Sequence, residues 1–409
     1  MKKKLLEKIK EKTATVAVVG MGYVGLPLAE AIVKKGFKLI GYDIDRQKIS
    51  NLKNKNKFLG VNLKKLNQFK NFIPTDNLKL LKLADIILIC LPTPLKENKN
   101  PDLSHINNFF SKCKYFFNYG QTFILESTTY PGTSLEIIKK NFSDKKFEFG
   151  KNIFFGYSPE RIDPGRQIKI TSIPKIVSGF TPNCKNIVKK FYSTIFDKII
   201  QSSDMETAEL AKLYENVYRS VNIALVNEMK IICDKLNLNI HNLINLASTK
   251  PYGFQTFQPG PGLGGHCVPV DPFYLAWKMK SKNFETKFIK LAGEINSYMP
   301  IWILKKIKML LKKKSTLKKR QKIIILGASY KKNVSDVRLS PSIEIINKLI
   351  QNNFIVDYMD PMVKTLYPKD GIYKKKNSLK LNYKKLKNYS LVLLLTDHDN
   401  FNYKKILKY

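Results

Sequence analysis

The sequence predicts an α/β protein in which two parallel-sheet domains are joined by a long central helical segment. Three observations support this prediction. In the first half of the chain, short apolar runs that end in polar turn residues alternate with helical stretches, which is typical of a parallel sheet with helices on both faces. A long helical pattern follows, and strand-led segments begin again beyond residue 320. We therefore expect domains at residues 1–203, 204–315 and 316–409.

The first domain opens with "MKKKLLEKIKEK", whose lysine-rich amphipathic pattern predicts a short helix ahead of the first strand. The stretch "ATVAVVGMGYVGLPLAEAIVKKGFKLIGYDID" then predicts a strand, a glycine turn, a helix and a second strand. The runs "ADIILICLPTP" and "QTFILESTTYPG" are apolar and end in polar residues, so each predicts a buried strand that leads into a turn.

The central segment begins at Ser203 or Asp204, because either side chain can serve as a helix N-cap. We expect this helix to connect domains and to form a subunit interface. A second helical pattern covers about 286–314 and ends at a polar, linker-like run, "KKKSTLKKRQ". In the third domain "KIIILGASY", "FIVDYMDP" and "SLVLLLTDHDN" predict strands. The apolar residues that recur at helical spacing in the central segment are Leu210, Leu213, Val217, Val221, Leu225 and Met229.

The net charge of +40 raises the question of a nucleic-acid partner, but only six of the 72 basic residues are arginines. Base-edge recognition favours the forked guanidinium, and no nucleic-acid motif is present, so a solvated lysine surface is the favoured interpretation. A positive field would still attract an anionic substrate. No apolar run approaches the ~20 residues that span a bilayer. We therefore expect no nucleic-acid partner, no membrane insertion and a cytoplasmic location.

The five cysteines are widely spaced and form no CxxC pair, so neither a disulfide framework nor a zinc site is expected, and no metal is predicted. Cys90 ends an apolar strand and Cys233 lies in an apolar helical stretch, so both are interpreted as core residues. Cys113 and Cys184 have lysine-rich surroundings and no partner in the sequence. Cys267 alone is surrounded by glycines that would leave space for a substrate.

A glycine motif follows the first predicted strand. Gly20 permits a tight turn, Gly22 lets the backbone approach a pyrophosphate, and Gly25 permits close packing of helix on strand. The next strand ends at Asp43, whose carboxylate would hold a ribose 2′-hydroxyl and repel a 2′-phosphate. The motif therefore predicts NAD rather than NADP. The alternative is a glycine turn in an unrelated α/β protein.

Cys267 lies in "PGPGLGGHCVPVDP", a loop just before a predicted helix with Asp271 as N-cap and Pro272 at its first position. A helix N-terminus favours the thiolate, which is the nucleophilic form. The alternative is a thiol that only fills a tight loop. A Cys/His hydrolase is disfavoured, because the side chain of the adjacent His266 diverges from that of Cys267 in extended chain. An NAD enzyme can use such a thiol to trap an aldehyde and oxidise it to a thioester.

Lys212 and Asn216 stand four residues apart in "AELAKLYENVY" and share one helix face. This polar pair interrupts a mostly apolar helix. From the spacing alone, two interpretations remain open: a functional pair, or a lysine and an asparagine on a solvated face.

Taken together, the motifs resemble those of the UDP-glucose/GDP-mannose 6-dehydrogenase family. In family order they are "VAVVGMGYVGLPLA", "CLPTP", "ESTTYPGT", "YSPERIDPG", "AELAKLYENVYRSVNIALVNE", "GPGLGGHCVPVDP" and "KKNVSDVRLSPS". The resemblance implies an enzyme that oxidises C6 of a nucleotide sugar from CH2OH to carboxylate and consumes two NAD. It also implies two Rossmann-like domains joined by a long helical dimerisation segment, hence a homodimer.

The resemblance also implies roles for individual residues. Cys267 matches the family's nucleophile, and Lys212 and Asn216 match the residues that stabilise the oxyanion. Asp271 matches the carboxylate that positions water. Glu160 matches the carboxylate implicated in thioester hydrolysis, and Thr128 its neighbour near the nicotinamide. The positions that match cofactor contacts are Gly20, Gly22, Tyr23, Val24, Gly25, Asp43, Lys48, Thr93 and Arg338. Those that match UDP-sugar contacts are Glu160, Arg161, Lys212, Tyr252, Phe257, Gly262, Gly264, Gly265 and Lys331.

The substrate prediction depends on two motifs. "SPERIDPG" and "GGHCVPVDP" look like the subgroup that acts on UDP-N-acetylhexosamines, whereas UDP-glucose enzymes usually carry a lysine where this chain has Val270. We expect oxidation of UDP-GlcNAc or UDP-GalNAc to the uronic acid, for surface polysaccharide. The alternatives are a UDP-glucose 6-dehydrogenase, a two-electron NAD-dependent hydroxyacid dehydrogenase, and a lysine-rich protein that binds nucleic acid without catalysis.

Overall fold

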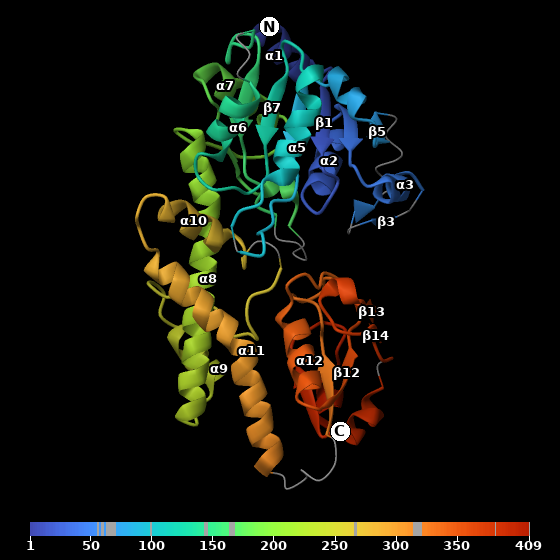
Figure 1. The fold of residues 1–409 in the computed structure, drawn as a ribbon, viewed down its shortest axis with the longest axis vertical. Helices are drawn as coiled ribbons and strands as arrows, with labels where there is room; N and C mark the ends of the chain where they lie inside the picture. Colours follow the sequence, from blue (N-terminus) through green and yellow to red (C-terminus); the bar gives the residue numbers. More distant parts are fainter. Residues whose placement is uncertain are drawn as a thin grey trace. The chain divides into compact units, whose positions relative to one another are not determined.

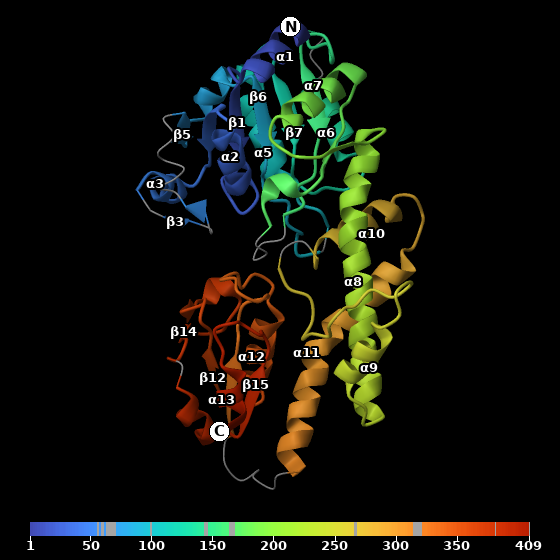
Figure 2. The same ribbon diagram turned by 180° about the vertical axis from the view of Figure 1, so that it is seen from behind.

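The computed structural model divides the chain into two compact units, Met1–Tyr214 and Glu215–Tyr409, which are described separately below (Figures 1 and 2). The long helix α8 (Met205–Lys235) contains the point of division, so the predicted three-domain boundaries stay predictions. The structure describes residues 1–54, 57–58, 61–62, 71–98, 100–142, 146–162, 168–265, 268–313, 321–380 and 382–408.

The first unit is built on a six-stranded sheet with the order β5-β2-β1-β6-β7-β8, and every pairing in it is parallel. The predicted strands and the predicted parallel sheet are therefore confirmed. The strands are β1 (Thr15–Val19), β2 (Lys38–Tyr42), β5 (Phe72–Thr75), β6 (Ile86–Ile89), β7 (Thr122–Leu125) and β8 (Phe154–Tyr157). Two small pairs accompany this sheet: β3 (Lys57–Phe58) with β4 (Val61–Asn62), and β9 (Lys175–Val177) with β10 (Ile199–Gln201).

Successive side chains of a strand point to opposite faces of the sheet, and those of β1 are apolar on both faces. Helices therefore cover both faces of this sheet. Val16 and Val18 of β1 belong to one apolar cluster, and Ala17 and Val19 belong to another. The first cluster takes residues of α1 (Lys2–Glu11), α2 (Gly25–Lys34), α3 (Arg46–Asn54) and α7 (Pro182–Ser193). The second takes residues of α5 (Ser104–Cys113) and α6 (Thr133–Asn141). Short 3-10 helices are η1 (Leu78–Leu83), η2 (Lys114–Phe116) and η3 (Ile170–Ser172).

The N-terminus of α8 is capped as the sequence predicts. The carboxylate of Asp204 accepts a hydrogen bond from the backbone N–H of Thr207 at 2.7 Å. The prediction for the helix after the cysteine loop is wrong by one residue. Asp271 is itself the first residue of that helix, and Val270 occupies the N-cap position. The other helices of this segment are α9 (Ile240–Ala247), α10 (Asp271–Lys280) and α11 (Lys287–Lys313).

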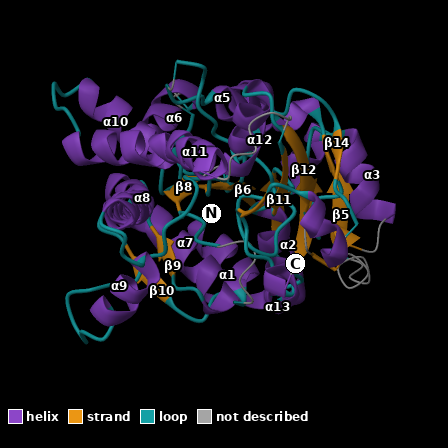
Figure 3. Cartoon of the chain, turned by 90° about the horizontal axis from the view of Figure 1, so that it is seen from below, coloured by secondary structure: helices purple, strands orange, loops and turns teal. Residues whose placement is uncertain are grey.

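The C-terminal part of the second unit contains a parallel sheet with the order β12-β11-β15, and α12 (Pro341–Gln351) packs against β12 (Figure 3). Ile323 and Ile325 of β11 belong to one apolar cluster with α12, and Ile324 and Leu326 belong to another. The strands are β11 (Lys322–Leu326), β12 (Ile355–Met359) and β15 (Leu391–Leu394), as predicted. The remaining elements are β13 (Thr365–Leu366), β14 (Lys376–Asn377), η4 (Pro368–Asp370), η5 (Tyr383–Asn388) and α13 (Tyr403–Lys408).

The four cysteines that the structure describes are free. Cys113 and Cys184 are buried in spite of their lysine-rich sequence surroundings, and Cys233 is buried as predicted. Among the described residues, no helix combines the length and the apolarity that a membrane span requires. The same part of the chain holds no group of three His, Cys, Asp or Glu side chains that could bind a metal ion.

Candidate active site

The glycine turn joins β1 to α2, and its three glycines meet different constraints. A Cβ at Gly20, whose φ is +96°, would lie 2.6 Å from the carbonyl oxygen of Cys90, and a Cβ at Gly25 would lie 1.9 Å from that of Gly20. The fold itself therefore requires both glycines. At Gly22, no atom of the described chain comes within 4 Å of such a Cβ. This open position, just before the N-terminus of α2, fits the close approach of a pyrophosphate.

Asp43 lies directly after β2 and is buried against the same turn. Its Oδ2 accepts hydrogen bonds from the backbone N–H of Met21 at 2.9 Å and from Nζ of Lys48 at 2.6 Å. Its Oδ1 accepts one from the N–H of Asp45 at 3.0 Å. The structure thus brings together two predicted cofactor residues, Asp43 and Lys48, at the carboxyl edge of the sheet, where α/β proteins bind dinucleotides.

Thr93 and Thr128 lie at the same edge, after β6 and β7. The hydroxyl of Thr93 donates to the carbonyl of Thr128 at 2.8 Å. The neighbouring hydroxyl of Ser127 donates to the carbonyl of Leu91 at 2.7 Å. These bonds hold the segments that follow β6 and β7 against each other.

Glu160 belongs to a buried ionic cluster that the sequence did not predict. Nζ of Lys175 lies 2.6 Å from Oε2 of Glu126 and 3.3 Å from Oε2 of Glu160. Oε1 of Glu160 accepts from the backbone N–H groups of Arg161 at 2.7 Å and Ile162 at 2.8 Å. All three ionisable side chains are buried, and the hydroxyl of Tyr192 donates to the other oxygen of Glu126.

The cluster contains one cation, Lys175, and two carboxyl groups, those of Glu126 and Glu160. Burial raises the pKa of Glu126 to about 7, although the Lys175 ammonium opposes the shift. Burial alone would lower the pKa of Lys175, but the carboxylates of Glu126 and Glu160 outweigh it and raise that pKa. Lys175 also lies 5.1 Å from the centroid of the Tyr192 ring. Lys175 therefore stays a cation and holds Glu160 in place.

Arg161, which was predicted to contact substrate, extends to the carbonyl of Pro174, with Nη1 at 3.0 Å. The guanidinium thereby joins the segment after β8 to the residue just before Lys175.

Glu209 is a second buried carboxylate that the sequence did not single out. From α8 it accepts hydrogen bonds from the backbone N–H of Gly132 at 2.6 Å, and from the N–H and the hydroxyl of Ser134 at 2.8 and 2.7 Å. The first N–H groups of a helix have no partner within it, so Glu209 binds the beginning of α6 by accepting from them. This contact connects the helix that carries Lys212 with the segment after Thr128.

Lys212 and Asn216 are both buried, with 8% and 9% of their surfaces exposed. The solvated-face interpretation of this pair is therefore wrong. The side-chain amide of Asn216 donates to Oδ2 of Asp271, the first residue of α10, which is 2% exposed. The carboxylate of Asp271 is thus directed at α8, beside the N-terminus of its own helix.

The glycine loop before α10 packs against the C-terminal domain. A Cβ at Gly264 would lie 2.5 Å from the Cβ of Tyr330, and one at Gly265, whose φ is +82°, would lie 2.8 Å from the Tyr330 ring. The N–H of Gly265 donates to the carbonyl of Arg338 at 3.0 Å. Packing against the Tyr330 side chain therefore requires both glycines on their Cβ side, and the expected room for substrate beside Cys267 stays a prediction. Cys267 and its neighbour His266 lie outside the described residues.

The remaining predicted substrate residues lie along this loop and on the segment that it contacts. Gly262 has φ +133°, and a Cβ there would lie 3.2 Å from the carbonyl of Asn296. Tyr252 is 72% exposed, whereas the Phe257 ring packs edge-on against Tyr218. The buried Asn227 of α8 binds this loop, because its Oδ1 accepts a hydrogen bond from the N–H of Gly260 at 2.8 Å.

Lys331 and Arg338 lie on the segment between β11 and α12. Nε and Nη2 of Arg338 donate to the carboxylate of Asp336 at 3.0 and 2.6 Å. Lys331 is half-buried. Lys331 belongs to the same unit as Gly264 and Gly265, and the residue before it, Tyr330, packs against both glycines.

Comparison with known proteins identifies three family models along the chain. They are the NAD binding, central and UDP binding domains of the UDP-glucose/GDP-mannose dehydrogenase family, and they match residues 14–196, 206–298 and 324–409. The UDP-N-acetyl-D-mannosamine dehydrogenase of Methanocaldococcus jannaschii is 35% identical over 393 residues, which are 94% of this chain and 86% of that relative. The UDP-N-acetyl-D-glucosamine 6-dehydrogenase of Pseudomonas aeruginosa is 33% identical over 358 residues, which are 86% and 84% of the two chains.

Solved structures give the same picture. The UDP-D-ManNAc dehydrogenase from Pyrococcus horikoshii superposes with a TM-score of 0.86 at 28% identity, over 96% of this chain and 92% of that one. The UDP-N-acetyl-mannosamine dehydrogenase from Staphylococcus aureus gives a TM-score of 0.80 at 30% identity, with the same coverage.

Proposed function

This chain belongs to the UDP-glucose/GDP-mannose dehydrogenase family, and from that premise we propose that it oxidises C6 of a UDP-N-acetylhexosamine to the carboxylate through a covalent intermediate on Cys267. Membership makes the chain an NAD-dependent UDP-sugar 6-dehydrogenase. The observation that supports the proposal best is the buried pair Lys212 and Asn216, with Asn216 bonded to Asp271, four residues beyond Cys267.

The residues of the glycine turn fit NAD. The open side of Gly22 and the N–H groups at the start of α2 would take the pyrophosphate, and Asp43 would take the adenosine ribose hydroxyls. Bound NAD supplies the hydride acceptor for each of two oxidations. Because the Asp43 carboxylate is fixed by Met21 and Lys48, a 2′-phosphate at that position would meet an anion held in place.

The covalent chemistry conserves atoms and electrons as follows. The CH2OH group first loses a hydride and a proton and becomes an aldehyde. The Cys267 thiolate then adds to the aldehyde carbon, and loss of a second hydride from the thiohemiacetal gives a thioester. Water cleaves the C–S bond, which releases the carboxylate and restores the thiol. One alcohol, one water and two NAD give one carboxylate, two NADH and three protons.

The protein's part is electrostatic and positional. The ammonium of Lys212 and the amide of Asn216 would stabilise negative charge on the C6 oxygen. Asp271 orients the Asn216 amide and would position the hydrolytic water. The family resemblance assigns Glu160 to thioester hydrolysis and Thr128 to the neighbourhood of the nicotinamide. The segment Tyr252–Gly265, Arg161 and Lys331 would bind the UDP-sugar.

A homodimer is part of the proposal. Many large apolar side chains of the helical segment are exposed in the single chain, which is the pattern of a subunit interface. Leu225 is 56% exposed in the middle of α8, so Leu225→Glu should shift the species seen by sedimentation from dimer to monomer. The most exposed of these side chains on α8, α9 and α11 are Tyr214, Leu225, Leu246, Phe288 and Leu291. We also propose a cytoplasmic location and a role in supplying a uronic acid for surface polysaccharide.

The decisive experiment is a side-by-side assay of the purified protein with UDP-GlcNAc, UDP-GalNAc, UDP-ManNAc and UDP-glucose. The mannosamine substrate is included because relatives with that name match the chain. Two NADH per sugar on an N-acetylated substrate supports the proposal, and preference for UDP-glucose selects the alternative. One NADH per sugar would instead indicate a two-electron dehydrogenase. Cys267→Ser should reduce turnover by at least about a thousandfold, whereas Cys233→Ala, at a buried thiol of α8, should retain it.

A further inference from the structure

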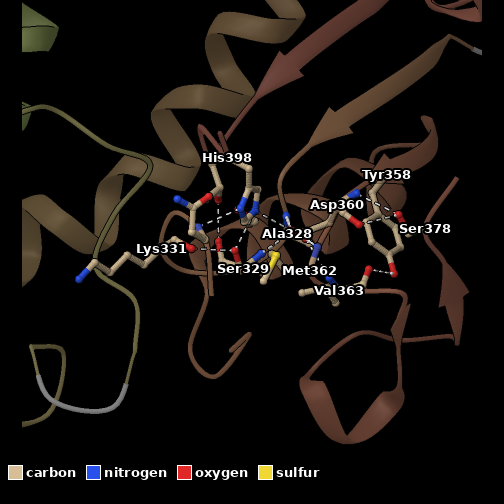
Figure 4. Close-up of polar contacts among 12 residues, drawn as sticks. Ala328, Ser329, Lys331, Tyr358, Asp360, Met362, Val363, Ser378 and His398 are labelled. Carbon is tan, nitrogen blue, oxygen red and sulfur yellow. Dashed lines mark hydrogen bonds and ion pairs between the residues drawn. The ribbon is translucent and has the colours of Figure 1, made fainter. Parts of the chain in front are cut away.

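We propose that His398 is a positioning residue that holds the segment around Lys331 in the shape that binds the nucleotide of the substrate (Figure 4). The inference rests on the proposed role of Lys331 and extends it to a residue that would not touch the substrate. His398 follows β15 in the run Thr396–Asp399, and its side chain is fully buried.

The hydrogen bonds of His398 define its tautomer. Nδ1 lies 3.0 Å from the backbone nitrogen of Asn333, which can only donate, so Nδ1 is the acceptor and carries no proton. The proton of the neutral ring is therefore on Nε2. That nitrogen lies 3.2 Å from Oδ2 of Asp360 and 3.1 Å from Oγ of Ser329.

This arrangement of serine, histidine and aspartate is not a hydrolytic triad. In such a triad the carboxylate and the serine bind opposite nitrogens of the ring. Here both contact Nε2, and Ser329 and His398 are both 0% exposed. The cluster is therefore structural.

Asp360 supplies an anionic anchor for the ring. Its Oδ2 also accepts from the N–H groups of Ala328 at 2.7 Å and Ser329 at 3.1 Å, and its Oδ1 accepts from those of Met362 at 2.7 Å and Val363 at 2.9 Å. These bonds fix the end of β12 to the start of the segment after β11. His398 thus joins three strand ends, because its own residue follows β15.

The same network fixes the backbone on both sides of Lys331. The hydroxyl of Ser329 donates to the carbonyl of Lys331 at 2.9 Å. The hydroxyl of Thr396 donates to the backbone carbonyl of Ser329 at 2.6 Å. Two residues beyond Lys331, Nδ2 of Asn333 donates to the carboxylate of Asp399 at 2.5 Å. Oδ1 of Asn333 accepts from the backbone N–H of Asp399 at 3.2 Å.

Lys331 is the residue that this network leaves directed outward. Its side chain points away from the His398 cluster, while its backbone belongs to the cluster (Figure 4). Precise placement of a cation for a diphosphate requires a rigid backbone beneath it. The buried ring of His398 provides that rigidity.

The test replaces His398 in the full chain with alanine, asparagine and glutamine. Asparagine can place an acceptor near the position of Nδ1, and glutamine can place a donor near that of Nε2, so the two variants separate the two halves of the network. Binding of UDP alone is measured by titration calorimetry, and kcat and KM are measured for the UDP-sugar that the wild type oxidises.

We expect His398→Ala to weaken UDP binding about tenfold or more and to raise KM similarly, with kcat changed less than about twofold. His398→Asn should recover part of the affinity, because it restores the acceptor for Asn333. Wild-type UDP affinity in a folded His398→Ala protein would overturn the inference. So would a loss of kcat at constant KM.

If the alanine variant does not fold, the comparison of His398→Asn with His398→Gln is the test, because asparagine restores the acceptor for the N–H of Asn333 and glutamine does not. UDP should then bind more tightly to the asparagine variant than to the glutamine variant. UDP affinity equal to that of the wild type in both variants would overturn the inference. Failure of the wild type to bind UDP would instead refute the proposed function.

Discussion

The carboxylate of Glu209 on α8 accepts both hydrogen bonds that Ser134 offers at the beginning of α6, from the backbone N–H at 2.8 Å and from the hydroxyl at 2.7 Å. With the third bond from Gly132, one buried side chain binds the N-terminus of a helix that belongs to another part of the sheet domain. The contact links Lys212, one turn further along α8, to the segment that carries Thr128.

Removal of this carboxylate should destabilise the protein. Glu209→Ala leaves two buried N–H groups without their acceptor, and each such group costs about 1–3 kcal/mol. We expect the free energy of unfolding to fall by about 2–5 kcal/mol in urea denaturation. The exposed neighbour Glu206→Ala is the control and should change it by less than about 0.5 kcal/mol. Equal effects of the two variants would contradict the assigned role.

Glu209 should also make stability depend on pH. Burial raises the pKa of Glu209 to about 7 in the folded protein, above its value of 4.5 in the unfolded chain, so folding favours the protonated form. The stability that this group contributes is fully present below about pH 4.5 and is lost as pH rises through 7. Glu209→Gln does not titrate. The stability of wild type relative to Glu209→Gln should therefore be greater at pH 5 than at pH 8, by up to about 3 kcal/mol.

The buried cation Lys175 predicts a second stability effect. Lys175→Met leaves Glu126 and Glu160 without their shared partner, and breaking a buried pair in this way costs about 3–5 kcal/mol. The loss should be smaller at pH 5 than at pH 8, because burial already raises the pKa of Glu126 to about 7 and protonation removes its charge. Lys169→Met, at an exposed lysine, is the control. A loss that is the same at both pH values would show that the two carboxylates are not its cause.

The sequence was sufficient for features that depend on local pattern. Apolar runs predicted the parallel strands, and the glycine spacing predicted the turn at Gly20–Gly25. Features that depend on partners distant in the chain were missed. Lys175 lies 49 residues from Glu126, and nothing in "IPKIV" distinguishes a buried lysine from an exposed one. Its apolar neighbours on both sides were the only available signal.

Two local motifs meet partners that the sequence did not indicate. The Cβ sides of Gly264 and Gly265 face Tyr330, which is more than sixty residues away in sequence, and the expected room for substrate beside Cys267 stays a prediction. Asp271 was expected to cap its own helix, but it is the first helical residue and binds Asn216 of α8. In both cases a tertiary contact decides what a local motif does.

The bond between Asn216 and Asp271 gives a prediction about catalysis. Asn216→Asp would place two carboxylates in contact in a buried site, where like charges raise the pKa of one of them. We expect kcat to fall by about a hundredfold or more at pH 8 and to recover partly toward pH 6, because a shared proton restores the hydrogen bond. Initial rates across this pH range check the prediction. Asn222→Asp, at a half-buried asparagine on the same helix, should leave the profile unchanged.

The glycine turn allows a test that separates cofactor binding from folding. Gly22→Ala adds a methyl group where the described chain leaves 4 Å of open space, so the thermal midpoint should change by no more than about 2 °C. The same methyl group would stand where the pyrophosphate must approach, and we expect NAD affinity to fall at least about tenfold in fluorescence titration. Gly25→Ala is the contrasting variant, since its Cβ would lie 1.9 Å from the carbonyl oxygen of Gly20 and should destabilise the fold itself. Unchanged NAD affinity in Gly22→Ala would show that the dinucleotide does not bind at this turn, whatever the stability of the protein.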